Sequence, residues 1–208
     1  MITLAIARGR LLDESSDLLI KAGYPVGNII KDSRKLVFEF PKQGLKILII
    51  RPTDVPQYVD HGAADIGIVG KDTLIEDKYD LYEPLDLGIG KCKLVVAAPK
   101  DFEFSHNKTL RVATKYPRIS HNHFSSKGIT ADVVKLYGSV ELAPIVGLSD
   151  VIVDLTSTGE TLKKNELKEI ELISEISARI VVNRVSMKVK SKEIKSFIKK
   201  LADARQKN

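Results

Sequence analysis

The residues with most potential for chemistry lie in one short segment, 150–162, which reads DVIVDLTSTGETL. Its β-branched residues 151–153 are typical of a buried parallel strand, and Asp154 follows them directly. Several hydroxyl side chains come next, with Gly159, which lets the backbone approach a ligand and point its N–H groups one way. A helix beginning near Glu160 would add its positive N-terminal end. The pattern predicts a cradle for an anion such as a monophosphate.

Asp154 makes this prediction more specific. A carboxylate beside a phosphate would repel it unless the carboxylate served ribose hydroxyls or a magnesium ion. Phosphate, sugar hydroxyls and a divalent cation together indicate an activated phosphoribose. The alternative is an ordinary strand–turn–helix in which the hydroxyl residues only cap the helix. The segment is not a P-loop, because no lysine follows the glycine as G-x-x-x-x-G-K-[ST] requires.

The stretch 141–162, ELAPIVGLSDVIVDLTSTGETL, resembles the signature of the ATP phosphoribosyltransferase family. The matching positions are Glu141, Gly147, Asp154, Thr158, Gly159 and Thr161. Shorter matches extend the resemblance over nearly the whole chain: IARGRLL at 6–12, RPTDVPQYV at 51–59, DIGIVGKDTLIE at 65–76 and ATKYPR at 113–118. The resemblance implies a pentosyltransferase that transfers phosphoribosyl from phosphoribosyl pyrophosphate to N1 of ATP, giving N1-(5-phosphoribosyl)-ATP and pyrophosphate. This is the first step of histidine biosynthesis.

The resemblance also implies the roles of individual residues. Residues implied to bind phosphoribosyl pyrophosphate are Glu141, Asp154, Leu155, Thr156, Ser157, Thr158, Gly159, Glu160 and Thr161. Those implied to bind ATP are Arg8, Gly9, Arg10, Arg51, Asp54, Asp72 and Tyr116. Arg10 and Arg34 are implied to be catalytic, Arg34 at the leaving pyrophosphate. Mg²⁺ is expected as cofactor, bound mainly through substrate phosphates rather than by a metal site of the protein.

The reaction itself makes few demands on acid–base chemistry. Adenine N1 carries an unprotonated lone pair near neutral pH, so no strong general base is needed and no Ser/His/Asp constellation is expected. The enzyme must instead align two anionic substrates and stabilise departing pyrophosphate. Arg8 and Arg10 frame Gly9 after the first expected strand, where guanidinium groups suit phosphate. The family usually has Lys-Gly-Arg at this turn, so Arg8 keeps the charge but changes its geometry.

Each of these residues also has a purely structural interpretation. Arg8 and Arg10 would then be a surface pair, and Arg51 and Asp54 an ion pair bracing a turn. Asp72 would only cap a helix.

Tyr116 would be a half-buried aromatic residue, and Glu141 a carboxylate in the first turn of a helix. His121 and His123 form an H-x-H pair, but such positions lie on different sides of a helix and are poorly placed to share a metal.

Composition favours a globular chain of the cytoplasm. The chain has 208 residues, of which 43% are hydrophobic and 29% charged, so it can bury substantial cores. The initial apolar run is too short for a signal peptide, and no stretch approaches the roughly 20 apolar residues of a membrane span. A single cysteine, Cys92, excludes an internal disulfide.

The net charge of +6 and pI near 9.2 come from the C-terminal end. Residues 184–208 hold nine Lys or Arg against two acidic residues. Apolar residues there recur at helical spacing: Ile194, Phe197, Ile198 and Leu201. We therefore interpret the lysines as the solvated face of a packed helix, with a partner-binding surface as the alternative. A nucleic-acid partner is not expected, because few aromatic residues accompany this local charge.

Strand and helix patterns alternate along the chain, which predicts α/β architecture with mainly parallel sheets. Strands are expected at 2–7, 36–40, 45–50, 65–69, 93–98, 110–113, 131–137, 170–176 and 179–182, besides the strand ending in Asp154. The resemblance implies two lobes like those of periplasmic binding proteins, with the active site in the cleft between them. Lobe I would comprise 1–88 plus 179–208, and lobe II, carrying the phosphoribosyl pyrophosphate loop, 89–178.

The length resembles that of the short-form catalytic subunit of the family. This form is implied to be a homodimer by itself. It is also implied to join a regulatory subunit resembling histidyl-tRNA synthetase in a hetero-octamer.

Overall fold

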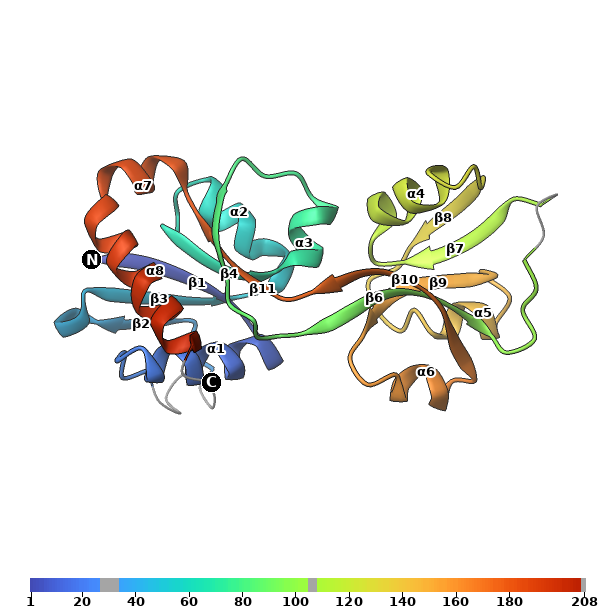
Figure 1. Ribbon diagram of the computed structural model, residues 1–208, viewed down its shortest axis with the longest axis horizontal. Coiled ribbons are helices and arrows are strands. Elements are labelled where there is room, and N and C mark those ends of the chain that lie inside the picture. The colour runs from blue at the N-terminus through green and yellow to red at the C-terminus, as the bar shows by residue number, and fades with distance from the viewer. Residues whose placement is uncertain (27–33, 105–107, 207–208) are drawn as a thin grey trace. The chain divides into compact units, whose positions relative to one another are not determined.

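A computed structural model describes residues 1–26, 34–104 and 108–206. The chain divides into two compact units. Unit 1 comprises Met1–Leu74, Lys78–Gly90 and Ser177–Asn208, and unit 2 comprises Ile75–Asp77 and Lys91–Ile176. Each unit is built on one β-sheet with helices on both of its faces (Figure 1).

The sheet of unit 1 has the strand order β2-β3-β1-β4-β11-β5. Its strands are β1 (Ile2–Ala7), β2 (Val37–Phe40), β3 (Leu45–Ile50), β4 (Ile66–Gly70), β5 (Tyr82–Asp86) and β11 (Ala178–Val182). Strands β3, β1 and β4 are parallel, whereas β2, β11 and β5 pair in antiparallel fashion. The three parallel strands are linked through helices, as such connections require.

Helices α1 (Arg10–Lys21) and α8 (Ser191–Gln206) cover one face of this sheet. Leu19 of α1 and Phe197 of α8 are almost fully buried in the resulting core. Helix α2 (Val55–Asp60) packs on the other face through its two buried valines. The remaining helices that begin in this unit are α3 (Lys71–Glu76), α7 (Arg184–Val189) and the 3-10 turns η1 (Pro41–Gln43) and η2 (Pro52–Asp54).

The sheet of unit 2 has the strand order β10-β6-β9-β7-β8. Its strands are β6 (Cys92–Pro99), β7 (Leu110–Thr114), β8 (Ala131–Lys135), β9 (Val151–Thr156) and β10 (Leu167–Ile176). Strands β9, β7 and β8 are parallel, and β6 and β10 are antiparallel to their neighbours. Its helices are α4 (Pro117–Ser125) on one face, and α5 (Leu142–Ile145) and α6 (Glu160–Lys164) on the other.

The predicted α/β class is confirmed, but the sheets are mixed. Each has three parallel strands, to which antiparallel strands are added. Strand β5 was not predicted, because Pro84 and its largely exposed residues give no strand pattern and suit only a sheet edge. Strand β10 begins at Leu167 instead of 170, since its first residues follow the pairing with β6.

The units differ from the predicted lobes at their limits. Residues 75–77 group with unit 2, although the sequence placed them in lobe I, and residues 89–90 and 177–178 group with unit 1, although the sequence placed them in lobe II. Within the described ranges, no helix is both long and apolar enough to span a membrane.

Candidate active site

The predicted cradle is a cavity in unit 2 where β9 ends and α6 begins. Its volume is about 140 Å³. Gly159 immediately precedes α6 with φ +76° and ψ 1°, a left-handed conformation that favours glycine. The cavity is lined by Val95, Glu141, Ile152, Asp154, Leu155, Thr156, Ser157, Thr158, Gly159, Glu160, Thr161 and Leu162. All nine residues expected to bind phosphoribosyl pyrophosphate therefore line one cavity.

Two backbone amides of this loop are bonded to the loop's own hydroxyl groups. The N–H of Gly159 donates to Oγ1 of Thr156 at 3.1 Å, and that of Glu160 donates more weakly to Oγ1 of Thr158 at 3.4 Å. A hydroxyl that accepts such a bond still has its own proton to donate. The loop can therefore bind an anion through threonine hydroxyls that the backbone already orients. The N–H groups of Gly159 and Glu160, which the sequence suggested for direct contact with the anion, are thus engaged within the loop.

The alternation of strand β9 determines which of its side chains face the cavity. Val151 and Val153 point into the core that α4 covers, whereas Ile152 and Asp154 point to the opposite face. Oδ1 of Asp154 accepts the N–H of Leu155 at 2.8 Å, which fixes the carboxylate beside the loop. The strand thus delivers one carboxylate to an otherwise hydroxyl-rich wall.

Glu141 brings a second carboxylate to the cavity from the residue preceding α5. Carboxylate oxygens accept hydrogen bonds from sugar hydroxyls and are ligands that Mg²⁺ prefers. Among the described residues, however, no group of three or more His, Cys, Asp or Glu side chains is arranged to hold a metal ion.

An ion pair anchors the other end of β9. Asp150, directly before the strand, accepts hydrogen bonds from Nη2 of Arg111 at 2.6 Å and from Nε at 3.2 Å. This guanidinium lowers the pKa of the Asp150 carboxyl. Nη1 of Arg111 also donates to the carbonyl of Gly147 at 2.8 Å. The pair ties β7 to β9, so the strand that carries Asp154 has a fixed position in its sheet.

A second group of predicted residues lies at one edge of the sheet of unit 1. Strands β3, β1 and β4 are parallel neighbours, so their carboxyl ends meet at the same edge. Arg8 follows β1, and its N–H donates to the carbonyl of Ile50, the last residue of β3, at 2.8 Å. Arg51 follows β3, and Asp72 follows β4. Sequence pattern placed each at a strand end, and the sheet order makes them neighbours.

Arg34 belongs to the same edge. It precedes β2, which is antiparallel to β3, and the carbonyl of Leu36 accepts the N–H of Ile49 near the end of β3. Among the described residues, neither a side-chain hydrogen bond nor an ion pair engages Arg8, Arg34 or Arg51. The ion pair of Arg51 with Asp54 that would brace the turn is not formed. With Arg10, four exposed guanidinium groups come to one edge, which suits a polyphosphate.

Asp72 is nearly buried, with 8% of its surface exposed. A Cβ atom added at Gly70 would lie 2.1 Å from its Oδ1, so the carboxylate occupies the space above that glycine. The predicted contact of Asp72 with ATP stays a prediction.

Tyr116 is less accessible than its expected role requires. It is 4% exposed and packs with Ile119 and Phe124 in the core on the α4 side of the sheet. The cavity opens on the other side, over Val95 and Ile152. Burial therefore favours the structural interpretation of this tyrosine, and its contact with ATP stays an untested prediction.

Sequence patterns did not single out the apolar lining of the cavity. Val95 comes from the neighbouring strand β6, in register with Asp154, and Leu162 comes from α6. Both belong to the core cluster under α5 and α6. In the sequence, these two residues show only the alternation of apolar residues typical of a strand and the apolar spacing typical of a helix. Such patterns identify core residues but do not show which of them contact a ligand.

Comparison with known proteins identifies the family. The family model for ATP phosphoribosyltransferase (HisG) matches residues 51–203. An ATP phosphoribosyltransferase of Citrifermentans bemidjiense is 52% identical over 204 residues, which is 96% of this chain and 96% of the relative. This chain belongs to the ATP phosphoribosyltransferase family. The predicted family and the predicted class of enzyme, a pentosyltransferase, are confirmed.

Other relatives of the family agree. An ATP phosphoribosyltransferase of Thermoanaerobacter sp. (strain X514) is 52% identical over 203 residues, covering 97% of this chain and 95% of the relative. The solved ATP phosphoribosyl transferase (HisG:HisZ) complex from Thermotoga maritima contains a chain with a TM-score of 0.86 and 38% identity, covering 99% of this chain and 98% of that one.

A more distant similarity concerns the fold alone. The periplasmic aliphatic sulphonate binding protein SsuA from Escherichia coli has a TM-score of 0.61 and 13% identity, covering 98% of this chain and 72% of that one. The expected likeness to periplasmic binding proteins is confirmed.

Proposed function

We propose that this chain transfers the phosphoribosyl group of phosphoribosyl pyrophosphate to N1 of ATP, releasing pyrophosphate, as the first step of histidine biosynthesis. The observation that carries the proposal is the cavity of unit 2 in a chain of this family. It joins a hydroxyl-rich loop to the carboxylates of Asp154 and Glu141.

The loop is proposed to bind the 5′-phosphate. The hydroxyls of Thr156 and Thr158 are oriented by backbone N–H groups and can donate to phosphate oxygens. The carboxylate of Asp154, assisted by Glu141, would accept hydrogen bonds from the ribose hydroxyls. Holding the sugar at both points would leave its anomeric carbon as the free, reacting position.

The arginine edge of unit 1 is proposed to bind the phosphates of ATP and the leaving pyrophosphate. Arg8, Arg10 and Arg51 present guanidinium groups at neighbouring strand ends, and Arg34 approaches from β2. As the bond to pyrophosphate breaks, negative charge grows on the leaving oxygens while the ribose becomes positive. Arg10 and Arg34 would stabilise that negative charge, and N1 of adenine attacks without prior loss of a proton.

Mg²⁺ is the proposed cofactor, and the donor set of the cavity is compatible with it. Asp154 and Glu141 offer oxygen atoms, the ligands that this cation prefers, and the substrate phosphates would supply the others. When bound, the ion neutralises charge on the pyrophosphate.

The assembly is proposed by analogy with the relative of known structure. That protein is a HisG:HisZ complex. We propose that this chain likewise joins a regulatory HisZ subunit. From the sequence resemblance we further propose that it forms a homodimer by itself, that the regulatory subunit resembles histidyl-tRNA synthetase, and that the two kinds of subunit form a hetero-octamer.

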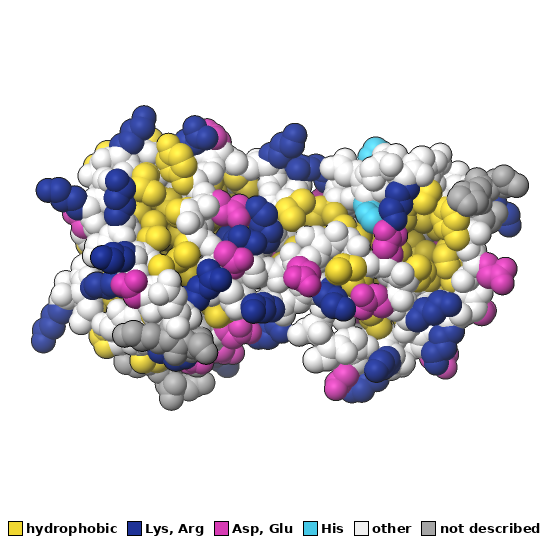
Figure 2. Space-filling model, viewed as in Figure 1, with side chains coloured by type: hydrophobic (Ala, Val, Ile, Leu, Met, Phe, Trp, Pro, Cys, Tyr) yellow, Lys and Arg dark blue, Asp and Glu magenta, His cyan; other side chains and the backbone are white. Residues whose placement is uncertain are grey.

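On the face shown in Figure 2, Lys and Arg side chains are interspersed with Asp and Glu. That no nucleic acid binds stays a proposal, made because the excess of basic residues is local to 184–208.

The test is pyrophosphate release by the whole chain, supplied with its regulatory partner and Mg²⁺. Release should require ATP and phosphoribosyl pyrophosphate together, and the nucleotide product should carry the added ribose phosphate at N1 by mass spectrometry and NMR. Folded chain in the complete mixture that releases no pyrophosphate would contradict the proposed function. Release from phosphoribosyl pyrophosphate alone would indicate a hydrolase instead.

A further inference from the structure

The side chain of Glu14 connects a predicted substrate arginine to the segment where the chain leaves unit 1. Its Oε1 lies 3.6 Å from Nε of Arg10, one helical turn before it in α1. Its Oε2 accepts the backbone N–H of Gly90 at 2.6 Å, across 76 residues of sequence. Gly90 is the last residue of unit 1 before the chain enters unit 2. The carboxylate of Glu14 therefore interacts with both Arg10 and Gly90, through one oxygen each.

The position of Arg10 is poorly explained by helix stability. It is the first residue of α1, where the positive end of the helix dipole disfavours a cation. An Arg–Glu pair at i, i+4 is also less favourable with the cation on the N-terminal side. Both ends of the pair are partly exposed, so the pair contributes little to stability. The pair with Glu14 therefore adds little to the stability of the helix, which leaves the orientation of Arg10 as its main effect.

The contact with Gly90 is close and specific. Gly90 has φ +62°, and a Cβ added to it would lie 3.2 Å from Cδ1 of Leu11. Leu11 and Glu14, at i and i+3, lie on one side of α1. This side of the helix therefore leaves little room for a side chain at position 90 and holds the backbone there by a hydrogen bond to a charged oxygen. A charge-assisted bond of this kind is stronger than a neutral one.

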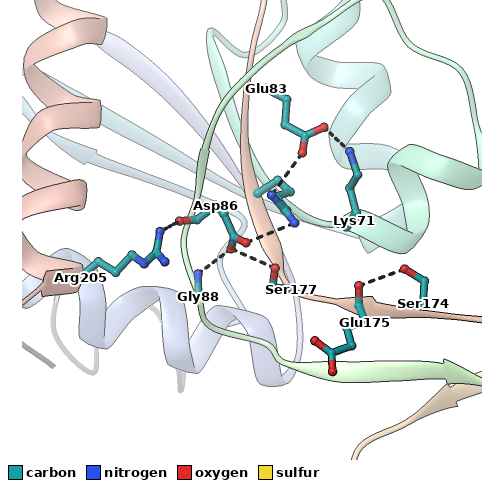
Figure 3. Close-up of polar contacts among 9 residues, drawn as sticks. Lys71, Glu83, Asp86, Gly88, Ser174, Glu175, Ser177 and Arg205 are labelled. Atoms are coloured by element: carbon teal, nitrogen blue, oxygen red, sulfur yellow. Dashed lines mark hydrogen bonds and ion pairs between the residues drawn. The ribbon is translucent and has the colours of Figure 1, made fainter. Parts of the chain in front are cut away.

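The segment 86–90 is itself held firmly within unit 1. The carboxylate of Asp86 accepts the N–H of Gly88 at 2.8 Å and the hydroxyl of Ser177 at 2.9 Å, and Arg205 donates to the carbonyl of Asp86 at 2.6 Å (Figure 3). Strand β11 adds a hydrogen bond from the N–H of Ala178 to the carbonyl of Ile89. A displacement of this segment would therefore reach α1 through Glu14.

We propose that Glu14 is a positioning residue that orients Arg10 toward the substrate phosphates. It does so by holding helix α1 to the segment 86–90 through the hydrogen bond with Gly90. The proposal rests on the proposed function for the role of Arg10. Glu14 itself contacts neither substrate. Its carboxylate holds the guanidinium through Oε1 and the backbone of Gly90 through Oε2, and so keeps the first turn of α1 in place.

The test is a double-mutant cycle between positions 14 and 10 in the whole chain. Glu14→Gln retains an acceptor for Gly90 and loses the charge that faces Arg10, whereas Glu14→Ala loses both. Asp13→Asn, an exposed carboxylate of the same helix turn, is the matched control. Thermal unfolding shows whether each variant is folded.

Two quantities are measured: kcat and KM with both substrates and the regulatory partner, and the affinity of the chain for ATP by calorimetry. Glu14→Ala should lower kcat/KM about tenfold, the effect expected of about 1.4 kcal/mol, and Glu14→Gln should lower it less. In an Arg10→Ala background, Glu14→Ala should add less than about a twofold loss. Asp13→Asn should change neither quantity appreciably.

Equal losses from Glu14→Ala in both backgrounds would overturn the proposal, because Glu14 would then act independently of Arg10. An Arg10→Ala variant with unchanged rate and unchanged ATP affinity would also overturn it. Calorimetry separates this from the proposed function, since it needs no turnover. A chain that shows the coupling in ATP affinity and releases no pyrophosphate would contradict the function and support the role of Glu14.

Discussion

Asp154 shows how a single residue acquires a functional setting. It lies on the face of β9 opposite the valines that enter the core, and its carboxylate accepts the N–H of Leu155. The same face carries Ile152 and, across the strand pair, Val95. A charge placed between apolar side chains and a hydroxyl-rich loop is partly shielded from water, which strengthens its interaction with a bound sugar.

Replacing Asp154 by Asn tests this role with little change of shape. The amide oxygen can still accept the N–H of Leu155, so the melting temperature should hardly change, whereas the charge and two acceptor sites are lost. We expect kcat/KM for pyrophosphate release to fall by about 100-fold or more. Unchanged kinetics in a folded variant would reject the assignment of this carboxylate.

Gly70 has no side chain, and this leaves room for the carboxylate of Asp72. Oδ1 of Asp72 occupies the place where a side chain at position 70 would begin. Gly138 is the natural contrast, because an added Cβ there would meet no heavy atom within 4 Å.

Gly70→Ala should therefore displace the Asp72 carboxylate. We expect a loss of about 1–3 kcal/mol in the free energy of unfolding, the usual cost of overpacking, and weaker binding of ATP. Urea denaturation and calorimetry measure the two effects. Gly138→Ala, the control, should change stability by less than about 0.5 kcal/mol, and a similar loss from both variants would contradict the explanation.

At the scale of elements, Asp65 joins three of them. It precedes β4 and accepts hydrogen bonds from the N–H of Thr3 in β1, from Ser186 in α7 and from Nζ of Lys190. Burial alone would raise the pKa of the Asp65 carboxyl, but the bonds from Lys190, Ser186 and Thr3 outweigh it and lower that pKa. The network holds helix α7, which follows β11, against the start of β4.

A depressed pKa has a defined consequence for stability. The ionised carboxylate stabilises the fold at pH values above the ordinary pKa of Asp, near 3.9, and this contribution is lost as pH falls through the lower pKa of the folded state. Asp65→Asn should lower stability at pH 7 by about 1–3 kcal/mol and should make stability less dependent on pH between about 5 and 2. Denaturation at several pH values measures this difference.

Asp101→Asn, an exposed carboxylate in the turn after β6, serves as the control and should retain the acid dependence of the unmodified chain. If Asp65→Asn also retained that full dependence, the network would not be the source of the acid sensitivity. Other carboxyl groups with lowered pKa values, such as those of Asp86 and Asp150, account for the part that remains.

At the scale of the whole molecule, the two sets of site residues belong to different units. The arginine edge is in unit 1, and the hydroxyl-rich cavity is in unit 2. The proposed reaction requires both substrates, so neither unit alone would support it.

Feedback inhibition by histidine tests the proposal that a separate subunit regulates this chain. Because the proposed partner is a regulatory subunit, we expect histidine to act through that subunit; the isolated chain should bind no histidine by calorimetry, and millimolar histidine should leave its rate unchanged. Adding the partner should create both binding and inhibition. Strong inhibition of the isolated chain would contradict this proposal.

The cradle was largely predictable from the sequence, because its parts are contiguous. Asp154 to Thr161 follow one strand directly, and Gly159 allows the turn there, so local rules of strand, turn and helix place them together. The α/β class followed from the same kind of local pattern. Strand β5 and the mixed order of the sheets did not, since pairing depends on contacts far apart in the sequence.

The sequence by itself determined the type of chemistry, since the order of carboxylate, hydroxyl and glycine residues is local and matches a known signature. Only the tertiary structure placed Tyr116 in a core and joined Glu14 to Gly90. The physical reason is that strand order and helix packing are decided by burial of apolar surface over the whole unit. The spacing of residues along the chain does not show which strand order and which helix packing result.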